Sequence, residues 1–255
     1  MEIVVLPTPA DIARAAADRI ADLVNKRPDA VLGLATGSSP LPLYQELARR
    51  HREEGLSFAR ASAFLLDEYV GLSPDHPEAY RNVIRREFVS LVDIPTSAVH
   101  SPSGTAADIS AACAEYEKEM QAAGGVDIQI LGIGTDGHIA FNEPASSLTS
   151  RTRVTTLTEQ TREDNARFFD HIDDVPMHVV TQGLGTIMEA REIILIATGA
   201  NKAEAVAQLV EGPISAFWPA TVLQNHQDIT VFADEEAGAE LKLRDYYDHM
   251  YRNRP

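Results

Sequence analysis

The segment that follows an apolar run at residues 128–133 carries the densest set of groups that could do chemistry. It reads Gly-Ile-Gly-Thr-Asp-Gly-His-Ile-Ala-Phe-Asn-Glu-Pro over residues 132–144. Asp136 and Glu143 place two carboxylates within reach of the His138 imidazole, and neighbouring carboxylates raise the pKa of a histidine and fix its tautomer. The same groups could bind a cation, but no second histidine stands at HxH or HxxxH spacing. The segment therefore favours a proton-transfer catalyst over a metal site or a structural histidine.

An acidic pair, Asp67-Glu68, directly follows the apolar run 63–66. A carboxylate at that place could act as a general base beside a substrate. Acidic residues are also common at the start of solvated turns. Taken alone, the pair therefore favours a solvated turn at the start of a loop over a general base.

Two further segments could hold an anion. The first is the loop 36–39, made of Thr36, Gly37, Ser38 and Ser39 before a predicted helix, whose backbone N–H groups and dipole suit a phosphate. It is neither a Walker A loop nor a GxGxxG fingerprint, and Ser39 could simply cap the helix. The second is Lys202, which lies just inside another predicted helix, where an anionic ligand would offset its unfavourable position in the helix dipole.

Arginines that could add bidentate phosphate contacts gather in a polar stretch, residues 146–177. This stretch shows few strand signals and predicts a mobile lid over the site. Each arginine taken singly is also consistent with a solvated surface. The four are Arg151, Arg153, Arg162 and Arg167.

Short apolar runs predict the strands that must position these groups. Continuous rather than alternating apolar residues are typical of a parallel sheet that is covered on both faces. Helical patterns alternate with the runs, so the sequence predicts an α/β doubly wound fold, in which ligands bind at the carboxyl ends of the strands. The predicted strands are 3–6, 31–35, 63–66, 128–133, 193–197 and 229–233, and the predicted helices include 8–24, 40–50, 108–120, 201–211 and 234–252.

Composition and charge exclude several functions. The 255 residues carry 22 Lys+Arg and 38 Asp+Glu, a formal net charge of −16, which argues against nucleic-acid and anionic-membrane partners. A global charge does not describe a local site, so a phosphorylated small molecule stays possible. Cys113 is the one cysteine, and neither a signal peptide nor an apolar membrane span is found. We therefore expect a cytoplasmic protein with one domain over residues 1–255.

Taken together, the motifs resemble the glucosamine-6-phosphate deaminase family. The resemblance covers essentially the whole chain in order. The related 6-phosphogluconolactonases share the Asp-Gly-His segment but not the Phe-Asn-Glu-Pro that follows it here. The matching segments are Leu-Asp-Glu-Tyr-Val-Gly at 66–71, the run 132–144, Ala-Ser-Ser-Leu-Thr-Ser-Arg-Thr-Arg at 145–153, Asn-Ala-Arg-Phe-Phe at 165–169 and Gly-Ala-Asn-Lys-Ala at 199–203.

This resemblance implies a Rossmann-like fold that converts glucosamine 6-phosphate and water into fructose 6-phosphate and ammonium, without a metal or a redox cofactor. It implies that His138 opens the sugar ring while Asp136 and Glu143 hold and charge it. Asp67 would move a proton between C2 and C1, and Glu68 would help to position the amino group or the backbone. The implied phosphate ligands are Thr36, Gly37, Ser38, Ser39, Arg167 and Lys202.

Some bacterial members of that family are hexamers activated by N-acetylglucosamine 6-phosphate at a subunit interface. Ser146, Ser147 and Arg153 resemble that second phosphate site, but Thr155 stands where the allosteric members have a lysine. The loss of a cation weakens an anion site, so both allosteric activation and a homo-oligomer stay open. Two other functions remain as alternatives: a sugar-phosphate lactonase or isomerase of the same fold, and a non-enzymatic sugar-phosphate sensor.

Overall fold

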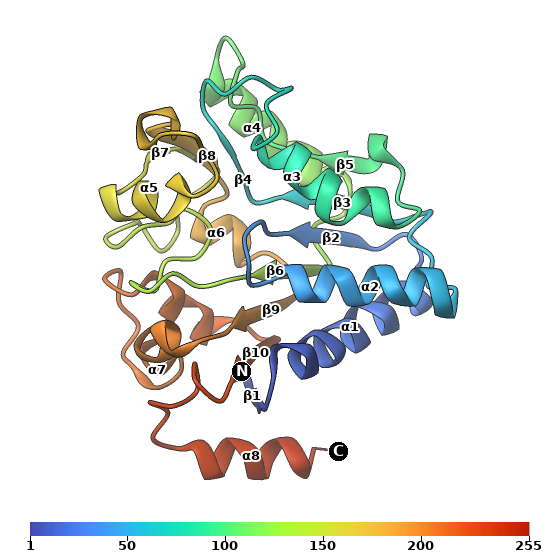
Figure 1. The fold of residues 1–255 in the computed structure, drawn as a ribbon, viewed down its shortest axis with the longest axis vertical. Coiled ribbons are helices and arrows are strands. Elements are labelled where there is room, and N and C mark those ends of the chain that lie inside the picture. The colour runs from blue at the N-terminus through green and yellow to red at the C-terminus, as the bar shows by residue number, and fades with distance from the viewer. Residues whose placement is uncertain (255) are drawn as a thin grey trace.

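The computed structural model describes residues 1–254, and a seven-stranded parallel sheet forms their centre (Figure 1). The strand order is β1-β10-β9-β6-β2-β3-β5, and each neighbouring pair is parallel. All six predicted runs form strands of this sheet, so the predicted α/β fold is confirmed. The strands are β1 (Glu2–Leu6), β2 (Val31–Leu34), β3 (Ser62–Leu65), β5 (Val99–His100), β6 (Ile128–Leu131), β9 (Glu192–Ala197) and β10 (Ile229–Asp234).

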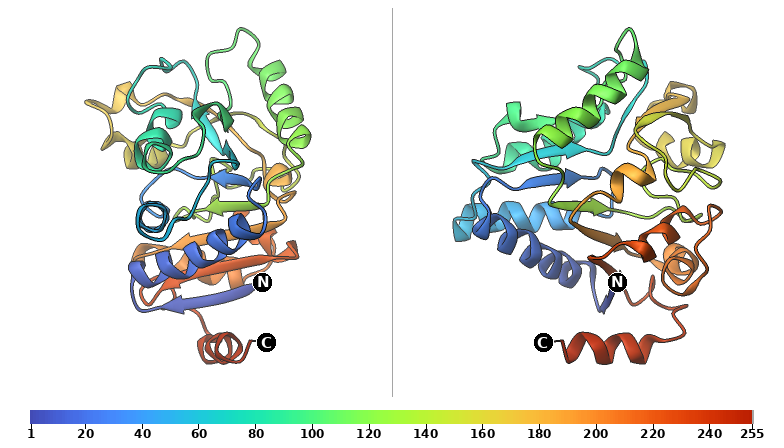
Figure 2. Two further views of the ribbon diagram at one scale, coloured as in Figure 1. Left: turned by 90° about the vertical axis from the view of Figure 1, so that its right-hand side faces the viewer. Right: turned by 180° about the vertical axis from the view of Figure 1, so that it is seen from behind.

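Helices cover both faces of the sheet, which explains why its strands are apolar throughout. Every residue of β2 and of β6 is buried. Figure 2 shows α1, α2 and α3 on one face and α4 on the other. The helices are α1 (Pro9–Lys26), α2 (Leu41–Glu54), α3 (Tyr80–Glu87), α4 (Ile109–Ala122), α5 (Glu159–Ala166), α6 (Leu184–Ile187), α7 (Ala203–Glu211) and α8 (Arg244–Arg252).

A second, three-stranded antiparallel sheet stands at the carboxyl edge of the first, in the order β4-β8-β7. Its strands are β4 (Asp67–Tyr69), β8 (His178–Thr181) and β7 (Arg153–Thr156). The acidic pair was expected in a loop, but it lies in β4, because the chain continues almost directly from β3 into a strand that pairs with β8. Asp67 and Arg153 both lie opposite Thr181, on its two sides.

Two other expectations from the sequence were wrong. Residues 146–177 contain the strand β7, whose side chains alternate between exposed and half-buried and therefore give no apolar run. The C-terminal helix was predicted over residues 234–252 but begins at Arg244. Asp234 instead ends β10, and its carboxylate accepts the N–H groups of Gly199 and Ala237, which holds this part of the chain in a turn.

No helix within residues 1–254 is both long enough and apolar enough to cross a membrane. The longest, α1, has 18 residues and carries charged side chains along its outer face.

The place of β4 depends on a close backbone approach at Gly104. A Cβ atom added there would overlap the carbonyl oxygen of Tyr69, the last residue of β4. We expect Gly104→Ala to lower the free energy of unfolding by about 1–3 kcal/mol, the usual cost of overpacking. Urea denaturation would measure this, with Ser103→Ala as the neighbouring control. A variant as stable as the wild type would contradict the close approach.

Candidate active site

One cavity of about 400 Å³ opens at the carboxyl ends of the central strands. Its walls come from the loops after β2, β3, β6 and β9, from α3 and the turn before it, and from the segment 146–177. This is the edge at which doubly wound sheets bind ligands. The cavity gathers eight of the predicted site residues, from distant parts of the chain: Thr36, Gly37, Ser38, Ser39, Asp67, His138, Arg167 and Lys202.

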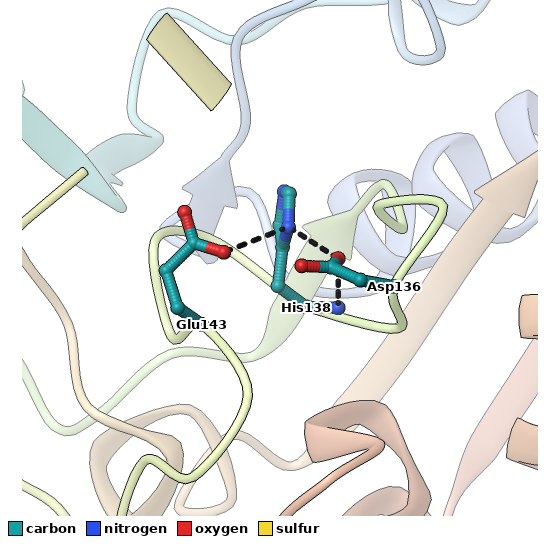
Figure 3. Close-up of side chains that lie close together, drawn as sticks. All are labelled: Asp136, His138 and Glu143. Carbon is teal, nitrogen blue, oxygen red and sulfur yellow. Dashed lines mark hydrogen bonds and ion pairs between the residues drawn. The ribbon is translucent and has the colours of Figure 1, made fainter. Parts of the chain in front are cut away.

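Beside the cavity, two carboxylates converge on one nitrogen of the His138 ring (Figure 3). Nδ1 of His138 lies 2.7 Å from Oδ1 of Asp136 and 3.5 Å from Oε2 of Glu143. The backbone N–H of His138 also donates to Asp136 Oδ1, at 3.2 Å. Asp136 and Glu143 are not among the residues that line the cavity, whereas His138 is. The carboxylates therefore orient the ring from behind and leave Nε2 for a ligand.

Glycines in this loop are required by its geometry. A Cβ atom at Gly134 would overlap the His138 ring, so only glycine lets the imidazole lie over the backbone. Gly137 has a φ of +78°, in the left-handed region that glycine adopts without strain. The turn is closed by the N–H of Gly134, which donates to the His138 carbonyl at 2.8 Å.

The two carboxylates determine the charge of the imidazole. Burial alone would lower the pKa of His138, but its contacts with Asp136 and Glu143 outweigh burial and raise the pKa to about 9. Burial likewise acts to raise the pKa of Asp136, and the interactions with His138 reverse this and lower it to about 2. At neutral pH the site therefore holds a charged imidazole between two acidic groups.

Asp136, His138 and Glu143 could also hold a cation. One ligand atom from each lies within 4.8 Å of the others, so the spacing alone would allow a metal. A metal ion there would have to displace a proton from the His138 ring, whose pKa the two carboxylates raise. The geometry and the charge together favour proton transfer.

Asp67 lies on the cavity wall with only 5% of its surface exposed. Burial, and after it the negative charge of Glu68, raise the pKa of Asp67 to about 8, while the charge of His138 acts in the opposite direction. A carboxyl group with such a pKa can change its protonation state near neutral pH, as a general acid or base must.

Glu68 does not face the cavity. Its carboxylate accepts the backbone N–H groups of Tyr69 at 2.9 Å, Tyr80 at 3.0 Å and Arg81 at 3.2 Å. Two of these donors belong to the first turn of α3, where backbone N–H groups have no partner within the helix. Glu68 was expected to position either the amino group of the substrate or the backbone, and in the structure its carboxylate contacts the backbone.

The loop 36–39 lies between β2 and α2. Gly37 has a φ of +97°, and the cap of α2 is Pro40, with no side-chain hydrogen bond. The possibility that Ser39 caps the helix is therefore wrong, and the first N–H groups of α2 keep no side-chain partner. This is the condition under which a helix N-terminus binds an anion.

Two cations, Arg167 and Lys202, line the same cavity as this loop. Burial lowers the pKa of Lys202, and the nearby charges of Asp164 and Asp136 partly offset that effect. The guanidinium of Arg167 lies over the Phe168 ring, 4.7 Å from its centre. Among the described residues, neither cation forms an ion pair with a carboxylate, so both can interact with an anion in the cavity.

The chain is similar in sequence and structure to proteins of one known family. A sequence profile described as Glucosamine-6-phosphate isomerases/6-phosphogluconolactonase matches residues 7–232. The chain belongs to this family. It is 63% identical over 255 residues to a glucosamine-6-phosphate deaminase of Arthrobacter sp. (strain FB24), and 54% identical over 256 residues to one of Streptomyces coelicolor. Each match covers 100% of this chain and 98% of the relative.

Solved structures of the family share the fold. A monomeric glucosamine-6-phosphate deaminase superposes with a TM-score of 0.92 at 44% identity, over 94% of this chain and 100% of that one. The 6-phosphogluconolactonase of Trypanosoma brucei reaches 0.73 at 23% identity, over 94% and 98% of the two chains, which shows the common fold alone.

The three residues predicted to form a second anion site lie outside the cavity. Arg153 donates to the Asn142 side chain at 2.9 Å and to the Ser146 hydroxyl at 3.3 Å, whereas Ser147 contacts Thr149. The structure thus brings Arg153 and Ser146 together. The second site itself stays a prediction.

Asp234 is a site residue that the sequence reasoning missed. Its carboxylate accepts the Gly199 N–H at 3.1 and 3.0 Å and so fixes the turn that carries Lys202 into the cavity. A signal was available, because Asp234 directly follows the apolar run 229–233, as the other site residues follow theirs. The sequence also showed no sign of a contact between α5 and the His138 loop, in which Thr161 donates to Glu143 Oε1 at 2.7 Å.

The charged state of His138 makes the stability of the protein depend on pH. The unfolded imidazole has a pKa of about 6.5, and the folded pKa is raised to about 9. The stabilisation is complete below pH 6.5 and is lost as the pH rises through 9, a change on the order of 3 kcal/mol. Urea denaturation from pH 6 to 9.5 would show this slope.

His138→Gln should make that slope shallower, and the part that remains comes from Asp67, whose raised pKa also makes the fold less stable as the pH rises. His249→Gln, on the exposed side of α8, should leave the slope unchanged. An identical slope in wild type and His138→Gln would mean that the imidazole is not charged by its neighbours.

Glu68 links the start of α3 to the protonation of Asp67. Glu68→Gln removes a charge that three N–H groups share, so we expect a loss of about 2 kcal/mol of stability. The pKa of Asp67 should also fall, because the adjacent negative charge that raises it is gone. NMR titration of carboxyl-labelled protein measures this, with the exposed Glu115→Gln as control. An unchanged Asp67 titration would refute the coupling.

Proposed function

We propose that this chain is a glucosamine-6-phosphate deaminase, which converts D-glucosamine 6-phosphate and water into D-fructose 6-phosphate and ammonium. The observation that carries the proposal is one cavity that holds a carboxyl group and a charged imidazole together with an anion-binding loop. Its 54–63% identical relatives, which match the full chain, bear the same name. A catabolic role in amino-sugar metabolism agrees with this reaction.

The phosphate group would bind at the loop 36–39 and the N-terminus of α2. Backbone N–H groups of the loop would contact it, together with the hydroxyl donors of Thr36, Ser38 and Ser39. At the start of α2 the donors are fewer, because Pro40 and Pro42 have no N–H. Arg167 and Lys202, which line the same cavity, would supply positive charge. Binding at this end places the sugar ring between Asp67 and His138.

Ring opening would fall to His138. The charged imidazole can give a proton to the ring oxygen of the sugar and receive one from the C1 hydroxyl, which leaves an aldehyde at C1. Asp136 and Glu143 keep the ring oriented and stabilise its charged form, which the proton from the C1 hydroxyl restores. A general acid–base step of this kind contributes about 10²–10⁴-fold in rate.

Asp67 would then move a proton from C2 to C1. The substrate carries a positive amino group at C2, and a cation beside Asp67 favours its ionised form. The carboxylate takes the C2 proton while the ammonium group gives a proton to O1, which forms an enolamine. Asp67 then returns its proton to C1, which leaves a protonated imine at C2. Water adds to that imine, and ammonia departs to give the ketose.

The organisation of the chain completes the proposal. We propose a single domain over residues 1–255, of which Pro255 lies outside the described residues, with residues 146–177 as a lid. Thr161 and Phe169 support the lid, since one bonds to Glu143 and the other packs against Tyr69, with ring centres 5.7 Å apart. A cytoplasmic location and the absence of a cofactor requirement belong to the same proposal.

A coupled assay tests the function directly. Purified protein with glucosamine 6-phosphate should release ammonium and fructose 6-phosphate in equal amounts. Hydrolysis of 6-phosphogluconolactone without ammonium release would instead make it a lactonase, and binding without turnover would make it a sensor. Light scattering with and without N-acetylglucosamine 6-phosphate would report the oligomeric state and the second anion site.

Asp67→Asn separates binding from chemistry. The amide keeps the size of the side chain but cannot accept the C2 proton, so we expect kcat to fall by about 10²–10⁴-fold. The affinity for the sugar phosphate should stay within a few-fold, because the loop 36–39 is intact. Calorimetric titration and the coupled assay measure the two effects. Wild-type turnover in this variant would show that Asp67 is not the base.

A further inference from the structure

The turn at residues 215–221, about 80 residues after His138 in the sequence, is hydrogen-bonded to the loop that carries His138. The N–H of Ala220 donates to the carbonyl of Gly137 at 2.8 Å, and the N–H of Ala145 donates to the carbonyl of Ala216 at 2.8 Å. Gly137 precedes His138, and Ala145 follows Glu143 by two residues. The two hydrogen bonds therefore bracket the segment that holds the imidazole and one of its two carboxylates.

The same turn places Trp218 against this loop. A Cβ atom at Gly137 would lie 2.7 Å from Cε3 of the Trp218 ring, so the ring packs directly on the backbone between Asp136 and His138. The ring is partly buried and also packs against the hydrophobic core. The ring therefore limits the space into which the backbone at Gly137, between Asp136 and His138, could move.

Thr221 holds the turn in shape. Its side chain is fully buried, and its hydroxyl oxygen accepts the N–H of Ser215 at 2.8 Å. The same oxygen lies 2.7 Å from the carbonyl of Trp218, to which the hydroxyl donates, and 3.1 Å from that of Ser215. One hydroxyl thus joins the beginning of the turn to the residue whose ring contacts Gly137.

The opposite side of the catalytic loop is fixed independently by β8. The hydroxyl of Thr181 accepts the Phe141 N–H at 3.1 Å, and the Asn142 amide donates to the Gln182 carbonyl at 2.8 Å. This second anchor does not reach Gly137. Near Gly137 the loop is held by its own hydrogen bond from the Gly134 N–H to the His138 carbonyl and, from outside the loop, by the turn 215–221. Changes in that turn can therefore alter the separation between Asp136 and His138.

We propose that Thr221 is a positioning residue of the catalytic centre, which acts through the turn 215–221 to hold His138 against Asp136 and Glu143. Its role in turnover rests on the proposed function. The charged groups that face His138 are Asp136 and Glu143 from its own loop and Asp67 from β4. Loosening the turn changes the first two contacts and leaves the strand that carries Asp67 in place.

The test compares substitutions at two buried threonines. Thr221→Val keeps the shape but removes the hydroxyl, Thr221→Ser keeps the hydroxyl, and Thr230→Val is the matched control in β10, where Thr230 is 1% exposed. We expect Thr221→Val to lower kcat about 10-fold with KM within twofold, as small misplacements of catalytic groups do. Thr221→Ser and Thr230→Val should stay within about threefold of the wild type.

NMR measures the pH at which the His138 ring is half protonated. If Thr221 only stabilised the fold, this midpoint would be the same in its variants. Thr221→Val should shift the midpoint of His138 to lower pH, and Thr221→Ser should restore it. Unchanged kcat and titration in Thr221→Val would overturn the proposal, as would equal losses in Thr221→Ser. If Thr221→Val does not fold, Trp218→Leu, which removes the ring from Gly137, should give the same lower midpoint, and a wild-type midpoint would overturn the proposal.

The two proposals fail in distinguishable ways. If the wild type releases no ammonium from glucosamine 6-phosphate, the proposed function fails. The titration of His138 still decides the role of Thr221, because it needs no substrate.

Discussion

Two carboxylates held against one imidazole nitrogen are the constraint on which the rest of this structure depends. Nδ1 of His138 can lie 2.7 Å from Asp136 and 3.5 Å from Glu143 only if the loop between them is held rigidly. Such a group of charges would otherwise relax into water, where each member is better solvated. The glycines of the loop, the strand β8 on one side and the turn 215–221 on the other all serve to keep these three groups together.

His138 and Asp67 lie in the same cavity, but their surroundings change their pKa values for different reasons. His138 is surrounded by acids and gains a pKa of about 9, whereas Asp67 is buried beside Glu68 and gains a pKa of about 8. Burial therefore acts against the charge of both groups, and only His138 has partners that overcome it. An enzyme that must both donate and accept protons near neutral pH needs groups with pKa values in this range.

The net charge of −16 does not describe this site. Unpaired N–H groups at the start of α2, together with Arg167 and Lys202, provide local positive potential in an acidic protein. Membership of the glucosamine-6-phosphate isomerase and 6-phosphogluconolactonase family agrees with a sugar-phosphate site of this kind.

The sequence by itself determined the parallel sheet, the segments at its carboxyl edge and the group of Asp136, His138 and Glu143, because apolar runs and short-range spacing are local properties. It did not determine that Asp67 lies in a strand of a second sheet, that Glu68 turns to the start of α3, or that Asp234 supports Lys202. Those depend on contacts between residues far apart in the chain, as do the hydrogen bonds between the turn 215–221 and the loop that carries His138. A three-residue strand such as β4 carries no periodic pattern of its own, so only packing against its partners decides its conformation.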